Sequence, residues 1–291
     1  MRSLHDEEVP LSLSIITELL ETQFPELSDQ RLWILNNAGT VNVVVRLGEK
    51  YVLRLPRQRA GSSNIEREAR WLPEIARHCS LRVPELHALG RPSEAYPLAW
   101  AIYYWMAGDR FDQSAALEDD NVSILSAFIS QLQELPVNDA PTSGRRPLAE
   151  LDTVTRDAID SSGSSINQER VLTIWTKAQS LPAWSGIGTW RHCDLLQSNL
   201  LVRDGRLHAV LDFGAAGVGD PASDIIAAWT VFSAAQRGRF RRELDVDDET
   251  WSRARAYALH QALLIIPYYR ERLPSFSRNA ERTVSEVLAD E

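Results

Sequence analysis

The sequence predicts an α+β fold in two lobes, a small β-rich lobe over residues 1–105 and a larger, mainly helical lobe over residues 106–291. Short β-branched runs gather in the first third of the chain, and helical spacing of apolar residues dominates the rest. The pair Asp204-Gly205 lies between two apolar runs, and such a pair is a strong hairpin signal. The helical lobe is therefore expected to contain an isolated hairpin.

Composition and charge limit the classes of partner. The chain has 291 residues, of which 44% are hydrophobic and 24% charged, as in ordinary globular proteins with a sizeable core. Its net charge of −9 argues against a nucleic-acid partner, which requires a positive surface. If the acidic residues are clustered, the charge favours cationic ligands. A small-molecule substrate and a monomer or dimer are expected.

The cysteines and the N-terminus indicate the compartment. Cys79 and Cys193 are far apart and lack a metal-binding or redox spacing, which favours a reducing environment without disulfides. The first residues are acidic where a signal peptide is basic, and no apolar run is long enough to span a membrane. The sequence predicts a cytoplasmic protein with no membrane partner.

The first lobe is expected to begin with a helix over Leu11 to Glu21, followed by a hairpin whose strands flank Gly48-Glu49. A two-residue turn would place Val45 opposite Val52 and Val43 opposite Arg54. One face of this hairpin would then carry three valines and a cation, which suits a purine ring with its phosphates beyond it. The alternative is a half-buried strand whose arginine reaches solvent.

A helix is predicted from Asn64, its N-cap, to His78, with Pro73 ending or kinking it near Trp71-Leu72. Glu68 within this helix is a candidate functional residue. An apolar aromatic strand follows within residues 98–108 and closes the first lobe.

Most of the second lobe has helical spacing. Asp220 and Pro221 have the residue types of an N-cap and first helical position, and predict a helix to about Gln236. Two more helices are predicted, one from Glu249 to Ile266 that ends at Pro267 and one from Asn279 to Leu288. Residues 138–146 are expected to form a surface loop.

The Asp204-Gly205 turn sets an expected register for the second hairpin. It places Arg203 opposite Arg206, Leu201 opposite His208 and Asn199 opposite Val210. Asn199 and Asp212 would then be diagonal neighbours on one sheet face, roughly 7–8 Å apart. An amide oxygen and a carboxylate at that spacing are suited to a hard cation such as Mg²⁺.

These residues stand at recognisable spacings. The run His192-Cys193-Asp194-Leu195, then Asn199, then Asp212-Phe213-Gly214, resembles the catalytic and metal-binding loops of the protein-kinase-like fold. The segment from Gly219 to Asp224, GDPASD, is similar to that of the aminoglycoside phosphotransferase family of small-molecule kinases. Both motifs occur at family spacing, and the likeness extends over nearly the whole chain.

The resemblance implies a role for each matching residue. Asp194 would be the catalytic base that accepts the proton of a substrate hydroxyl, and Asn199 and Asp212 would ligate Mg²⁺. His192 would orient the catalytic loop, and Asp224 would brace it through backbone hydrogen bonds. Cys193 departs from the family, which commonly has glycine there, and is expected to pack as a small hydrophobe.

The same resemblance implies a nucleotide site for ATP or GTP in the first lobe. Arg54 would bind phosphate where the family usually has lysine, and Glu68 would pair with it. The backbone of the interlobe linker would bind the purine edge, and the loop Asn37 to Asn42 would cover the phosphates. The full set of expected nucleotide-site residues is Val43, Val52, Arg54, Glu68, Tyr104, Trp105 and Met106.

The implied activity is transfer of a γ-phosphate to a hydroxyl of a small molecule, such as an aminoglycoside, macrolide or nucleoside antibiotic. A substrate wall is expected after Pro267, at Tyr268, Tyr269 and Glu271. Two alternatives stay open: a metabolic kinase for a sugar, choline or amino-alcohol, and a nucleotide-binding pseudokinase. The presence of the base and both metal ligands argues against the latter.

Overall fold

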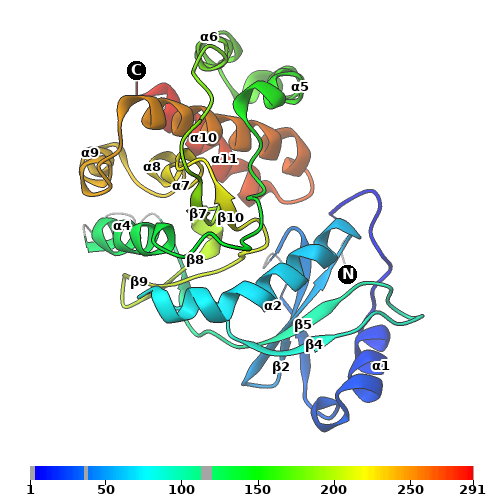
Figure 1. Ribbon diagram of the computed structural model, residues 1–291. Helices are drawn as coiled ribbons and strands as arrows, with labels where there is room; N and C mark the ends of the chain where they lie inside the picture. Colours follow the sequence, from blue (N-terminus) through cyan, green and yellow to red (C-terminus); the bar gives the residue numbers. More distant parts are fainter. Residues whose placement is uncertain (1–3, 36–38, 113–119, 291) are drawn as a thin grey trace. The chain divides into compact units, whose positions relative to one another are not determined.

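The structure is a computed structural model that describes residues 4–35, 39–112 and 120–290. It divides into two compact units, shown in Figure 1. Unit 1 comprises residues 1–77, 83–107 and 212–214, and unit 2 comprises residues 78–82, 108–211 and 215–291. Unit 1 is built on a sheet and unit 2 is mainly helical, which confirms the predicted α+β class.

Unit 1 contains an antiparallel sheet with the strand order β1-β2-β3-β5-β4. Side chains alternate between its two faces, so one face of β2 and β3 is fully apolar. That face packs in a core with helix α1, Leu13–Gln23, which begins at the N-cap Ser12. The strands are β1 (Leu32–Ile34), β2 (Asn42–Leu47), β3 (Tyr51–Pro56), β4 (Leu86–Gly90) and β5 (Trp100–Tyr104).

The register predicted for the first hairpin is wrong. The turn has three residues, because Leu47 pairs with Tyr51, and Arg54 therefore lies opposite Val44. Val43 is buried on the opposite face, in the core with α1, so it does not share a face with Arg54. Gly48 has a φ of 55°, which explains why a glycine stands at this turn. Val52 does share the face of Arg54.

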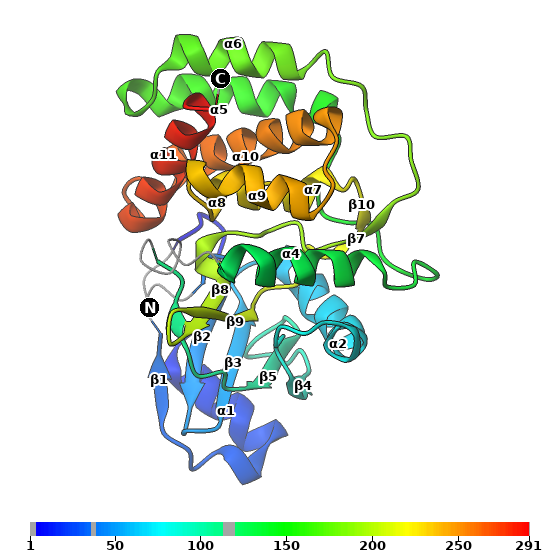
Figure 2. The same cartoon turned by 90° about the vertical axis from the view of Figure 1, so that its left-hand side faces the viewer.

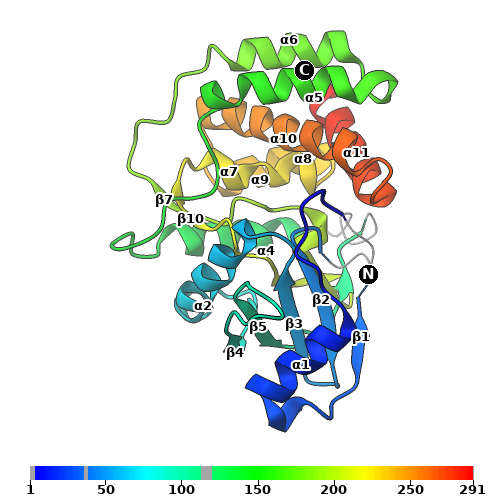
Figure 3. The same ribbon diagram turned by 90° about the vertical axis from the view of Figure 1, so that its right-hand side faces the viewer.

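Helix α2, Ala60–His78, covers the face of the sheet in unit 1 that is opposite α1, as Figure 3 shows. It begins before the predicted N-cap Asn64 and continues through Pro73. Pro73 removes one backbone hydrogen bond, but Leu72 and Ile75 beside it are buried. Their packing outweighs the missing bond, so the predicted break does not occur.

Unit 2 is formed mainly by helices. Figure 2 shows α5 and α6 lying side by side, with α10 and α11 beneath them. No helix in the described ranges is long and apolar enough to cross a membrane. The helices are α4 (Asp120–Gln133), α5 (Asp152–Ser162), α6 (Gln168–Ala178), α7 (Ala222–Ile225), α8 (Ala227–Thr230), α9 (Ala234–Glu243), α10 (Asp248–Tyr269) and α11 (Pro274–Leu288).

The single helix predicted from Pro221 to Gln236 is wrong, because this stretch contains α7, α8 and the start of α9. A new helix begins after Ser233, whose side chain forms a capping box with Gln236. The Thr230 hydroxyl at the end of α8 donates to the carbonyl of Leu195 at 2.6 Å. Breaking the helix thus lets α8 hold the loop that follows β7, Thr189–Arg191.

Helix α10 begins at the N-cap Asp247 and continues through Pro267, where the sequence predicted its end. The helix continues because its side chains pack against α11 and α5, and one missing backbone bond near its last turn costs less than that packing. The first residues of the predicted substrate wall are therefore helical.

The second hairpin has the predicted turn but not the predicted register. Asp204 and Gly205 both have positive φ, and Arg203 pairs with Arg206. A bulge between Leu201 and Val202 then shifts the pairing. In consequence Leu201 lies opposite Ala209 and Leu200, not Asn199, lies opposite Val210, in strands β8 (Leu200–Arg203) and β9 (Arg206–Val210).

The side chain of Asn121 on α4 stabilises this bulge. Its Oδ1 accepts from the Leu207 N–H at 2.7 Å, and its Nδ2 donates to the Gly205 carbonyl at 2.9 Å. The carbonyl of His208 accepts from the N–H of Arg82. These partners replace ladder hydrogen bonds, and no turn rule could have anticipated them.

Candidate active site

The loop after β7 is fixed by one buried carboxylate. Asp224 on α7 accepts from the backbone N–H of His192 at 2.9 Å and from that of Cys193 at 2.8 Å. Asp224 is fully buried, so both hydrogen bonds are shielded from water. These two hydrogen bonds are consistent with the bracing role that the resemblance implies, which stays a prediction.

Asp224→Ala is expected to lower the free energy of unfolding by about 2–5 kcal/mol, because it leaves two buried N–H groups without an acceptor. Urea unfolding at pH 7 measures the change. Asp157→Ala, an exposed substitution on α5, serves as the control and should alter stability by less than about 0.5 kcal/mol. Equal stability of the two variants would contradict the bracing role.

Cys193 adopts a backbone conformation that favours glycine. Its φ is 68°, which explains why the family commonly has glycine at this position. The side chain is buried, as expected for a residue that packs as a small hydrophobe. Burial, reinforced by Asp224, raises the pKa of this thiol to about 11.

We expect neither cysteine to be alkylated in the folded protein at pH 8. Burial raises the pKa of Cys79 to about 12, so both thiols remain protonated well above neutral pH and only thiolates react quickly. Mass spectrometry after iodoacetamide treatment tests this, with denatured protein as the control in which both react. Rapid labelling of native Cys193 would show that the thiol is exposed.

Asp194, the predicted base, has a donor on each carboxylate oxygen. Asn199 Nδ2 donates to Oδ2 at 2.7 Å and to the Asp194 carbonyl at 2.9 Å. Gln261 Nε2, from α10, donates to Oδ1 at 2.5 Å. Hydrogen bonds on both oxygens hold the carboxylate in one orientation, which a general base requires.

His192, for which a loop-orienting role is predicted, makes hydrogen bonds through both ring nitrogens. Its Nδ1 accepts from the Asp194 N–H at 3.2 Å, so its Nε2 is protonated and donates to the Leu211 carbonyl at 2.9 Å. Both ring nitrogens are therefore hydrogen-bonded to backbone groups, one to Asp194 and one to Leu211. This supports an orienting role and not proton transfer.

In unit 1 an ion network, buried at Arg54 and Glu68, joins three of the predicted residues. Arg54 Nη1 donates to both oxygens of Glu68 at 2.8 Å, and Arg54 Nη2 donates to Asp212 Oδ1 at 2.8 Å. The Glu68 side chain is only 1% exposed and also accepts from the Phe213 N–H and the Tyr103 hydroxyl. The fork of arginine can reach both carboxylates, which one ammonium group does less well.

Burial and neighbouring charges determine the pKa values of Arg54 and Tyr103 in this network. Burial alone would lower the pKa of Arg54, but the carboxylates of Asp212 and Glu68 outweigh burial and hold it well above its ordinary value. Burial, aided by Glu68, raises the pKa of Tyr103 well above normal. Arg54 therefore stays a cation and Tyr103 stays a hydrogen-bond donor.

For the remaining residues expected in the nucleotide site, the structure shows backbone hydrogen bonds of some and does not describe others. The N–H of Tyr104 donates to the Glu85 carbonyl at 2.9 Å, and that of Trp105 donates to the Lys50 carbonyl at 2.8 Å. Both N–H groups thus bond within unit 1, and the purine-edge role of residues 104–106 stays a prediction. Of the expected phosphate loop, residues 37 and 38 lie outside the described residues.

The predicted metal ligands have suitable donor atoms, although the hairpin register that first linked them is wrong. Both hydrogens of Asn199 Nδ2 point to Asp194, so Oδ1 is the atom that it has for a cation. Asp212 lies just beyond β9 with a φ of 66°, and its side chain is 37% exposed. Within the described ranges no cluster of three or more His, Cys, Asp or Glu could hold a metal alone. Two oxygen donors with substrate phosphates are typical of Mg²⁺ sites.

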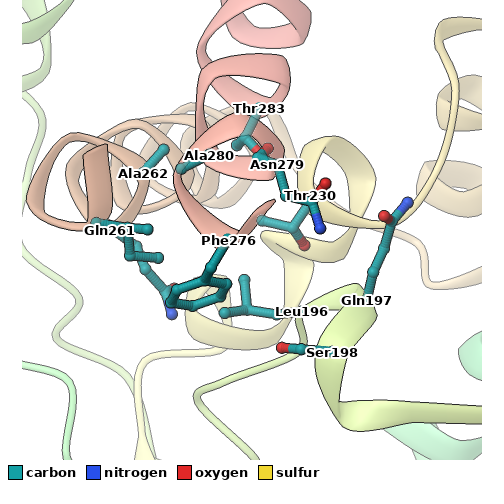
Figure 4. Close-up of a pocket in the computed structure, with 11 residues that line it drawn as sticks. Leu196, Gln197, Ser198, Thr230, Gln261, Ala262, Phe276, Asn279, Ala280 and Thr283 are labelled. Carbon is teal, nitrogen blue, oxygen red and sulfur yellow. The ribbon is translucent and has the colours of Figure 1, made fainter. Parts of the chain in front are cut away.

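A pocket in unit 2 adjoins the residues after Asp194 (Figure 4). Gln261 lines it, and Phe276 contributes an aromatic wall. Its lining side chains are all uncharged, and its empty volume, including the part open to solvent, is about 370 Å³. The lining residues are Leu196, Gln197, Ser198, Thr230, Gln261, Ala262, Ile265, Phe276, Asn279, Ala280 and Thr283.

The predicted substrate wall does not line this pocket. Tyr269 is buried against Phe276, with ring centroids 5.2 Å apart, so it lies behind the aromatic wall. Tyr268 packs on Tyr269 and is 39% exposed. Tyr268, Tyr269 and Glu271 are absent from the lining residues, and their contact with substrate stays a prediction.

Sequence reasoning missed three residues of these networks. Tyr103 lies in the predicted aromatic strand but has no expected role beside Glu68, Gln261 lies 67 residues from Asp194, and Arg145 comes from a predicted surface loop. Arg145 Nη2 donates to the Cys193 carbonyl at 2.7 Å and to Gln261 Oε1 at 2.9 Å. No local pattern marks these residues.

Comparison with known proteins gives both a family and a fold. The structure of APH(2″)-IIIa with GDP and kanamycin is 18% identical, with a TM-score of 0.75 over 95% of this chain and 99% of that one. An apoenzyme structure of the macrolide 2′-phosphotransferase MphH from Brachybacterium faecium is 19% identical, with a TM-score of 0.60 over 94% and 98%. The structure of ADP-bound APH(2″)-Ib is 17% identical, with a TM-score of 0.56 over 96% and 99%.

These likenesses confirm the fold implied by the loop motifs. A comparison with curated protein sequences found no match. The family model described as the phosphotransferase enzyme family, APH, matches residues 33–257. The resemblance drawn from the catalytic-loop motifs is thereby confirmed, and the chain belongs to the phosphotransferase enzyme family.

Proposed function

We propose that this phosphotransferase moves the γ-phosphoryl group of ATP or GTP, with Mg²⁺, to a hydroxyl of a small-molecule antibiotic. The observation that carries the proposal is Asp194, a carboxylate with a donor on each oxygen, in a loop braced by Asp224. Such a carboxylate suits the removal of a proton from a hydroxyl. The GDP- and ADP-bound structures of similar proteins support a nucleotide donor.

The proposed roles in the reaction are divided between residues of unit 1 and residues of unit 2. In unit 1 Arg54 supplies the cation for phosphate, and Glu68 fixes its position. Asp212 and Asn199 would hold Mg²⁺, which neutralises phosphate charge when bound. In unit 2 Asp194 accepts the proton of the acceptor hydroxyl. Phosphoryl transfer needs positioning and charge neutralisation more than covalent chemistry, and these are the group types present.

The pocket of Figure 4 has no charged side chain in its lining. Aminoglycosides carry several ammonium groups, which are usually met by carboxylates, whereas every residue that lines this pocket is uncharged. Its aromatic wall and amide and hydroxyl groups suit an apolar, hydroxylated molecule. At about 370 Å³, open part included, the pocket is smaller than a macrolide, and Asp194 is not among its lining residues, so it does not rank the antibiotic classes.

An acceptor panel tests the proposal. Purified protein with Mg²⁺ and either ATP or GTP is incubated with kanamycin, gentamicin, a macrolide, a nucleoside antibiotic, choline and a sugar. Nucleoside diphosphate release and the mass of the product report transfer, and EDTA is the control. Phosphorylation of choline or the sugar alone would indicate a metabolic kinase. Transfer to no compound, with nucleotide still bound, would favour a pseudokinase.

A further inference from the structure

The side chain of Gln261 lies against the catalytic carboxylate although it belongs to neither family motif. It projects from α10 and donates from Nε2 to Asp194 Oδ1 at 2.5 Å. Asn199 Nδ2 donates to the other oxygen, Oδ2, at 2.7 Å. The two donors come from parts of the chain that are far apart in sequence, and together they fix the plane of the carboxylate.

Arg145 determines which way the Gln261 amide points. Arginine has hydrogen-bond donors only, so the Gln261 atom that contacts Arg145 Nη2 at 2.9 Å must be the oxygen, Oε1. The amide nitrogen must therefore face Asp194. The same Nη2 donates to the Cys193 carbonyl at 2.7 Å, and the guanidinium lies 5.5 Å from the ring centre of Tyr257. Arg145 is thus held in place by the residue next to the base.

We propose that Gln261, oriented by Arg145, is a positioning residue that holds the Asp194 carboxylate in the geometry required for proton acceptance; this inference rests on the proposed function. Gln261 also lines the pocket of Figure 4. Misplacing a reacting group by about 1 Å can lower a rate by about 100-fold, so fixing the carboxylate has a large effect.

The test compares Gln261→Leu and Gln261→Glu with the parent protein. The leucine removes the donor, and the glutamate places a like charge against Asp194. Both variants should lower kcat by at least about 10-fold. KM for the nucleotide should change by less than about twofold, since the lost contact is to the base. The matched control, Gln179→Leu, changes a half-buried glutamine at the C-cap of α6 and should leave kcat unaltered.

A double-mutant cycle tests the role of Arg145. If Arg145 acts through Gln261, Arg145→Met combined with Gln261→Leu should have a kcat within about twofold of Gln261→Leu alone. Additive losses in kcat would show that the two residues act separately and would overturn the role given to Arg145. The rates are measured with the best acceptor of the panel, or as hydrolysis of Mg-ATP or Mg-GTP by water.

A crystallographic comparison keeps this inference separable from the proposed function. In crystals of Gln261→Leu, the Asp194 carboxylate should rotate away from its position in the parent. An unmoved carboxylate, an unchanged kcat, or a raised KM for acceptor with kcat intact would each overturn the inference. If the parent neither transfers phosphate nor hydrolyses nucleotide, the proposed function fails, and the crystal structures alone then decide whether Gln261 positions Asp194.

Discussion

Asp194→Asn is expected to lower phosphoryl transfer by at least about 100-fold, because the amide cannot accept the proton of the acceptor hydroxyl. The substitution nearly preserves size, and the backbone of the loop stays held by Asp224. Nucleotide affinity should therefore change little. Steady-state rates with the best acceptor of the panel, together with nucleotide titration by calorimetry, measure the two quantities.

The control for this variant is the unfolding temperature, which should stay within a few degrees of the parent. A turnover equal to that of the parent would remove Asp194 from the role of base. A similar loss of turnover and of nucleotide affinity would instead mean that the residue supports binding.

Arg54→Met is expected to destabilise unit 1 by about 3–5 kcal/mol, because it leaves the carboxylate of Glu68 buried without its cation. The Glu68 side chain is 1% exposed and that of Arg54 is 12% exposed, so water screens this pair poorly. Urea unfolding at pH 7, followed by circular dichroism, gives the free energy of unfolding. The variant should also lose nucleotide affinity.

The double variant Arg54→Met with Glu68→Gln separates charge from packing. Since glutamine carries no charge, the double variant should recover much of the stability that the single variant loses. Its Oε1 can still accept from the Phe213 N–H. If the double variant is as unstable as Arg54→Met alone, the loss comes from packing of the arginine stem and not from an unpaired charge.

The fold class could be predicted from the sequence because hydrophobic periodicity changes from strand-like to helical along the chain. The element boundaries could not, because tertiary contacts decided them. Pro73 and Pro267 are strong local helix breakers, yet buried neighbours and packing against other helices keep both helices continuous. Conversely, the capping box of Ser233 divides a stretch that looked continuous.

In the candidate site, too, some residues could be predicted from the sequence and others could not. Asp194, Asn199 and Asp212 could be found because their spacing along the chain matches a family motif. The predicted register of the second hairpin appeared to make Asn199 and Asp212 neighbours. That register was wrong, because the side chain of Asn121 stabilises a bulge that no turn rule predicts. Gln261 and Arg145 could not be found, since nothing near them in sequence relates them to the base.

The ion network of Arg54 has a consequence for dissecting the protein. Residues 212–214 belong to unit 1, where Asp212 accepts from Arg54 and the Phe213 N–H donates to Glu68. A fragment that stops at residue 107 would keep the arginine and the glutamate but lose both of these partners. Unit 1 is therefore discontinuous in sequence, and cutting the chain between the units would yield an incomplete unit 1.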